Sequence, residues 1–184
     1  QPQPYFHKPE LILTTNLAAP LPIGLTTPGS EPVKGTLEFS LDAPAGVKIS
    51  AGSVGKVLVE EIKPEALPDG GQRYRFAVPD AAADKVFGRL YIEAPGWHDG
   101  QRGELRYRFA HDDGGNRWQS GEQTIPLRAV TVTPAPRLKS IMAGMGWWQA
   151  SATAKWPGAL QAWRTLGFNN FPLFGMWMPD DAND

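Results

Sequence analysis

The aromatic residues that could bind a ligand gather near the end of the chain. Residues 144–158 contain three tryptophans, among them Trp147 and Trp148, whereas the first hundred residues contain only one. Trp177 follows after a further apolar segment. This clustering raises the question of which structural element brings indole rings together there, and for what purpose.

The sequence indicates neither a metal site nor a phosphate site. Asp180 and Asp181 could supply oxygen ligands for calcium, but their spacing matches no calcium-binding loop, and a polar loop explains them better. The three histidines are far apart and lack the spacing of zinc ligands. The segment GSVGK at 52–56 lacks the full spacing of a phosphate loop. We therefore expect no metal and no other cofactor.

The composition excludes several classes of partner. Lys and Arg number 18 against 19 Asp and Glu, so the sequence has no cationic surplus for nucleic acid or an anionic membrane. It has no cysteine. No apolar stretch is long enough for a membrane span. The chain starts at Gln1 without an apolar leader, which suggests a product trimmed of its targeting segment and located outside the cell or in the periplasm.

Most of the chain has the pattern of short β-strands. Twenty glycines and 18 prolines favour strands joined by turns. Apolar and polar residues alternate in 36–41 and 104–109, which is the period of a half-buried strand, and DDGG at 112–115 supplies a hairpin turn. The segments GKVLVEEI, QRYRFAVP and VFGRLYIEA continue the pattern, while the proline-rich PLPIGLTTPG suits a sheet edge. These features predict an antiparallel β-sandwich of about seven or eight strands.

The pattern changes after the proline-containing segment TPAPR at 133–137. Two apolar runs flank a segment with a helical apolar stripe, so 140–178 reads as a β-α-β unit. We therefore predict a β-sandwich domain over 1–135 and the start of a second domain over 136–184. Because one β-α-β unit leaves both sheet edges open, we expect the remaining C-terminal part of the same polypeptide to complete it.

This order of elements resembles the entry into the (β/α)8 barrel of secreted glycoside hydrolases that carry an N-terminal β-domain. The resemblance implies a mainly β chain in which an antiparallel β-sandwich is followed by the first β-α-β unit of a TIM barrel. It rests on the glycines and tryptophans at the first strand end, the segment after the helix, and the tryptophan at the second strand end: Gly144, Gly146, Trp147, Trp148, 162–171 and Trp177.

The resemblance also implies a function and a set of binding residues. In such barrels the active face lies at the carboxyl ends of the strands, where Trp147, Trp148 and Trp177 would stack on sugar rings and Asp180 and Asp181 would bind hydroxyls. The expected activity is carboxylate-catalysed hydrolysis of a polysaccharide or oligosaccharide. The catalytic carboxylates would lie beyond residue 184, and the chain alone would be inactive.

Two alternatives remain open at this point. The chain could be a non-catalytic β-sandwich module that binds carbohydrate or serves a structural role, or the barrel could carry a different chemistry such as that of a lyase or esterase. Trp97 and Trp118 bear on the first alternative, because they could form an aromatic platform for sugar rings. We favour a packing role for both, at the ends of the sandwich or at the seam with the next domain.

Overall fold

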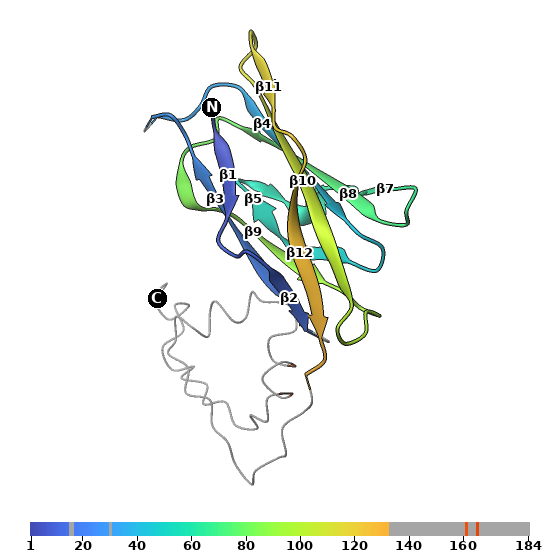
Figure 1. Cartoon of the computed structure of the whole chain (residues 1–184). Coiled ribbons are helices and arrows are strands. Elements are labelled where there is room, and N and C mark those ends of the chain that lie inside the picture. Colours follow the sequence, from blue (N-terminus) through green and yellow to red (C-terminus); the bar gives the residue numbers. More distant parts are fainter. Residues whose placement is uncertain (15–16, 30, 133–160, 162–164, 166–184) are drawn as a thin grey trace, which may run out of the picture. The chain divides into compact units, whose positions relative to one another are not determined.

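Two β-sheets pack face to face in the part of the chain that the computed structural model describes, residues 1–14, 17–29, 31–132, 161 and 165 (Figure 1). The chain divides into two compact units, Gln1–Thr131 and Val132–Asp184, and every strand below belongs to the first. Among the described residues, no helix is long and apolar enough to cross a membrane.

The two sheets are named A and B. Sheet A has the order β1 (Gln3–Phe6), β3 (Ala19–Thr26), β9 (Asp84–Glu93), β5 (Lys48–Val54) and β6 (Val57–Leu58). Sheet B has the order β2 (Leu11–Thr14), β12 (Gln123–Val130), β10 (Arg102–Asp112), β4 (Thr36–Ala43), β8 (Gln72–Pro79) and β7 (Glu65–Ala66), with β11 (Arg117–Gln119) paired to β10. A single 3-10 turn, η1 (Val59–Glu61), connects β6 to β7 in this part of the chain.

The core fills the space between the sheets with the apolar half of each alternating strand. On β4, Leu37, Phe39 and Leu41 are fully buried while Glu38 between them is exposed, as the sequence predicts. The other long strands contribute in the same way, because successive side chains of a strand point to opposite faces. The prediction of a mainly β chain containing a β-sandwich is therefore confirmed.

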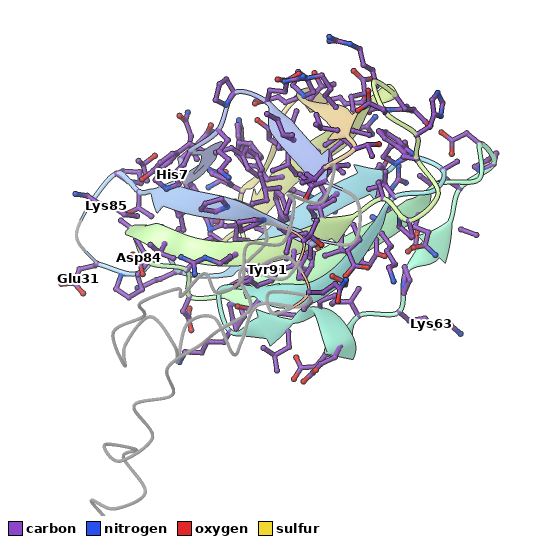
Figure 2. All side chains as sticks on the ribbon, turned by 90° about the horizontal axis from the view of Figure 1, so that it is seen from below. His7, Glu31, Lys63, Asp84, Lys85 and Tyr91 are labelled. Carbon is purple, nitrogen blue, oxygen red and sulfur yellow. The ribbon has the colours of Figure 1, made fainter. Side chains whose placement is uncertain are left out.

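The two N-terminal strands, β1 and β2, belong to different sheets. β1 pairs antiparallel with β3 in sheet A, and β2 then pairs parallel with β12 in sheet B. The imidazole Nε2 of His7, just after β1, donates a hydrogen bond to the Lys85 carbonyl of β9 at 2.8 Å (Figure 2). This bond links the strands on the two sides of β3, so the N-terminal segment closes one side of the sandwich.

The proline-rich segment is a sheet edge only at its prolines, so the prediction of an edge strand is wrong for β3 as a whole. β3 lies between β1 and β9, and Pro20 and Pro22 face Tyr91 and Arg89 of β9. The prolines are tolerated because β1 pairs only with residues 23–26 of β3, so their part of the strand has one hydrogen-bonded neighbour.

The prediction of a full strand over GKVLVEEI is also wrong. Only Val57–Leu58 is extended in a sheet, and the chain turns at once into η1, where Val59 is buried against the core. Gly55 before it has a positive φ, a conformation that favours glycine and starts the tight turn from β5. The segment thus crosses from the edge of sheet A to that of sheet B.

The predicted β-α-β unit at 140–178 lies outside the described residues, apart from Gln161 and Thr165. Nothing in the described part of the chain supports a (β/α)8 barrel, whereas the sandwich accounts for every strand in it. The domain limits at 135 and 136 remain predictions.

We predict that Phe39→Ala lowers the free energy of unfolding by about 3 to 5 kcal/mol, since it opens a cavity at the centre of sheet B's buried face. The Phe39 ring is 1% exposed, and its centroid lies 6.2 Å from those of both Phe76 and Tyr107. Urea denaturation followed by circular dichroism measures this loss.

Val86→Ala is the control for this measurement, because the Val86 side chain on β9 is 54% exposed. A surface change of this kind should alter the free energy of unfolding by less than about 0.5 kcal/mol. Equal effects of the two changes would contradict the assignment of the core.

Candidate functional site

A five-residue repeat surrounds the central strand of sheet B. The sequence Arg-Tyr-Arg-Phe-Ala occurs at 73–77 in β8 and again at 106–110 in β10. Both strands pair antiparallel with β4, and both place the repeat in the same register against residues 38–42. Each β4 residue in this range therefore has identical residue types on its two sides.

The aromatic positions of the repeat point into the core. Tyr74 and Tyr107 lie on either side of Leu41, and Phe76 and Phe109 lie on either side of Phe39. All of these side chains are buried. The repeat thus supplies much of the apolar face that holds β4 between its neighbours.

The other positions of the repeat point away from the core and form what we call the grid. It has three rows of three residues across β8, β4 and β10, each row set by the strand register. The rows are Ala77, Glu38 and Ala110; Arg75, Ser40 and Arg108; and Arg73, Asp42 and Arg106.

A hollow of about 380 Å³ lies over the grid and is lined by all nine of its residues. Arg117 and Gln119 of β11 and Glu122 of the following loop also line it. The hairpin of β10 and β11 therefore borders the hollow. Its turn extends past the other strands at one end of the sandwich (Figure 1). Ser40 at the centre of the grid and the alanines at two of its corners leave room because their side chains are short.

Carboxylates pair with the arginines of the lining. Arg73 forms two hydrogen bonds with Asp42, both of 2.6 Å, which is the bidentate geometry that the guanidinium favours. This bond is the main reason that the pKa of Arg73 is raised above its usual value. The remaining pairs join Arg75 to Glu65, Arg106 to Asp69 and Glu104, Arg108 to Glu122, and Arg117 to Glu38.

Exposed donors at the hollow favour a ligand that accepts hydrogen bonds. The lining contains five arginines and three carboxylates, and Glu65, Asp69 and Glu104 beside it also pair with its arginines. Arg75 and Arg108 are 59% and 48% exposed in their side chains, so part of each guanidinium remains open to solvent. Among the described residues, the Ser40 hydroxyl has no hydrogen-bond partner, and it is accessible from the hollow. The site can therefore donate hydrogen bonds from the middle row without breaking a buried contact.

The structure assigns packing roles to both tryptophans of the sandwich. The Trp97 Nε1–H donates to the Ala45 carbonyl at 3.1 Å, and its ring lies so close to Gly103 that a Cβ there would be 2.6 Å from it. The Trp118 ring packs on Phe109 at a centroid distance of 5.1 Å. Both rings pack against the core, so the packing role predicted for them is confirmed and the aromatic platform is not formed.

The binding residues predicted from the sequence lie elsewhere in the chain. Trp147, Trp148, Trp177, Asp180 and Asp181 are outside the described residues, so their roles remain predictions. Among the described residues, no three or more metal-ligating side chains are grouped to hold an ion.

The grid was missed at the level of sequence, although a signal for it exists. The two copies of Arg-Tyr-Arg-Phe-Ala are plain in the printed sequence. Identical alternating segments are candidates for equivalent positions in one sheet. The sequence does not show, however, that a third strand lies between them, because that pairing joins residues far apart in the chain.

Comparisons with known proteins find likenesses among solved structures alone. No family model matches the chain, and no curated protein matches it. Among solved structures, a cohesin module from a family 33 glycoside hydrolase of Clostridium perfringens is 9% identical, covering 71% of this chain and 97% of that one with a TM-score of 0.49. The sixth cohesin of Acetivibrio cellulolyticus scaffoldin B, solved with a dockerin, is 12% identical over 67% and 98%, with a TM-score of 0.42.

A third match is to a von Willebrand factor type A protein from Catenulispora acidiphila, 17% identical with a TM-score of 0.40. It covers 54% of this chain, which spans only 24% of that one. With TM-scores below 0.5, none of these likenesses carries an argument about ligand or partner.

The resemblance to a barrel glycoside hydrolase is corrected by the fold. Every strand in the described part of the chain belongs to the two sheets of the sandwich, and no (β/α)8 barrel is formed there. The predictions of a hydrolase, of a TIM barrel and of glycosidic bond hydrolysis as the function are therefore wrong. The alternative of a non-catalytic β-sandwich module agrees better with the findings.

Tyr107 gives the sandwich a pH dependence. Burial raises the pKa of its phenol, whose hydroxyl donates to Gln123 Oε1 at 2.6 Å. Above pH about 10 the unfolded chain loses this proton while the folded chain keeps it. The free energy of unfolding therefore falls as the pH rises from the unfolded pKa towards the folded pKa, because the unfolded state binds fewer protons in that range.

We predict that Tyr107→Phe makes the melting temperature fall less steeply between pH about 9 and about 11 than in the parent chain. Thermal unfolding over this range measures both slopes. Comparing slopes separates the titration from the constant loss of the Gln123 hydrogen bond. Parallel curves for parent and variant would show that Tyr107 does not titrate with folding.

Proposed function

We propose that the first unit is a non-catalytic β-sandwich module that binds another polypeptide through the hollow over the grid. The observation that carries this proposal is the hollow itself, on the outer face of sheet B, with arginines on both sides of a serine that has no partner among the described residues. The secreted or periplasmic location predicted from the sequence belongs to the same proposal.

The chemistry of the hollow supports binding rather than catalysis. The carboxylates in its lining, Glu38, Asp42 and Glu122, are each engaged by an arginine. General acid or base catalysis needs a carboxyl group placed to exchange a proton with the substrate, and each of these carboxylates contacts a guanidinium instead. An ion-paired surface of this kind fits recognition.

A polypeptide partner fits the hollow better than a sugar does. Sugar-binding sites stack aromatic side chains on the apolar faces of sugar rings, but the aromatic residues of this lining turn their rings to the buried face of the sheet. Phe39, Phe76 and Phe109 are at most 4% exposed. Guanidinium, carboxylate, hydroxyl and amide groups remain at the surface, and these suit the polar groups of an extended peptide.

Filling the hollow tests this proposal. We predict that Ser40→Trp abolishes peptide binding at the grid while leaving the fold intact, since residue 40 points away from the core. The probes are two short peptides of serine and threonine, one with a central glutamate and one with a central glutamine. Amide shifts in NMR spectra of the full chain locate the contact.

Val86→Trp is the matched control, because it adds the same side chain at an exposed position on sheet A. It should bind as the parent does. The proposal is overturned if neither peptide shifts the grid amides. If maltohexaose shifts them in that case, the face binds carbohydrate.

A further inference from the structure

We propose that the grid recognises a single carboxylate side chain of an extended peptide, held over Ser40 between Arg75 and Arg108. This inference rests on the proposed function and names the chemical group that the module reads. It follows from the order of residues in the rows, from the freedom of the two arginines and from the spacing along β4.

The middle row has a hydroxyl at its β4 position, whereas the rows on either side have a carboxylate there. On β4 the outward residues are Glu38, Ser40 and Asp42, so the central column carries a carboxylate above and below but a hydroxyl in the middle. In the row of Arg73, Asp42 and Arg106, the Asp42 carboxylate accepts two hydrogen bonds from the Arg73 guanidinium. The middle row has an arginine on each side of β4 and no carboxylate between them.

Arg75 and Arg108 of that row each pair with a carboxylate that lies outside strands β8, β4 and β10. Arg75 pairs with Glu65 of β7 at 3.0 and 3.3 Å, and Arg108 pairs with Glu122 in the loop before β12. Both pairs are largely exposed, and exposed ion pairs contribute little net stability. Each guanidinium has five N–H donors, so it can turn towards a ligand carboxylate while keeping contact with its present partner.

The spacing selects one acidic residue. Along a strand, residues two apart project from the same face at about 6.6 to 6.8 Å. A peptide running along β4 with its acidic side chain over Ser40 would place its next outward side chains near Glu38 and Asp42. Further acids there would meet like charges, so the favoured partner carries one acid with neutral residues two positions before and after.

The two peptides of the preceding experiment test this directly. We predict that the glutamate peptide binds the grid about tenfold more tightly than the glutamine peptide, the difference expected for hydrogen bonds to a charged group. Titrations are run at constant ionic strength with NMR shifts as the readout. Sodium sulfate is the third probe and should compete only weakly.

The outcomes separate the two proposals. Equal affinity of both peptides for the grid overturns the carboxylate inference but leaves the peptide-binding module standing. Absence of grid shifts with either peptide overturns both. If sulfate shifts the grid amides at lower concentration than the glutamate peptide, the site takes a free inorganic anion, which also overturns the inference.

A second test needs no ligand, because residue 40 can supply the carboxylate. We predict that Ser40→Asp melts about 2 to 4 °C above its neutral counterpart Ser40→Asn, through the two flanking arginines, and that it no longer binds the glutamate peptide. High salt should remove the difference in melting temperature. A lower melting temperature for the aspartate variant would show that Glu38 and Asp42 dominate the field there, and would overturn the inference.

Discussion

The register of β4 between its two neighbours is the constraint on which the rest of sheet B depends. Phe39 sits between Phe76 and Phe109 on the buried face, and Ser40 sits between Arg75 and Arg108 on the other. A slip of one residue on either side would move arginines into the core, at a cost far above the stability of a small domain. Core packing therefore fixes which strand position each arginine of the grid occupies.

The ion pairs of the grid orient side chains more than they stabilise the fold. Most are exposed, and pairs of that kind contribute little because water screens both charges. Their effect is geometric: the partners of Arg75 and Arg108 lie outside the three central strands and draw the guanidiniums away from Ser40. The Arg73–Asp42 pair is the exception, since its partners are 27% and 14% exposed and its two bonds close the lowest row.

The sequence predicted local strands well and long-range order poorly. Alternation in 36–41 and 104–109 identified β4 and β10. DDGG identified the turn between β10 and β11, where the Asp113 carboxylate accepts hydrogen bonds from the amides of Gly115 and Asn116. Strand neighbours were not predictable, because the order of a sheet depends on contacts between distant segments. For the same reason the proline-rich strand was placed at an edge, and the repeat at 73–77 and 106–110 was not recognised as a site.

The two outer faces of the sandwich differ in a way that supports the proposal of binding at sheet B. On sheet A, the Tyr5 ring lies against Gly24 and leaves no space for a Cβ there, and the prolines at 20 and 22 offer no backbone donor. The Tyr5 ring thus covers β3 at Gly24, and His7 nearby bonds to the Lys85 carbonyl of β9. On sheet B the short Ser40 side chain lies at the centre of the grid, and the arginines on both sides of it carry charge. Exposed donors therefore surround an open position on sheet B, whereas at Gly24 on sheet A the Tyr5 ring already fills the space.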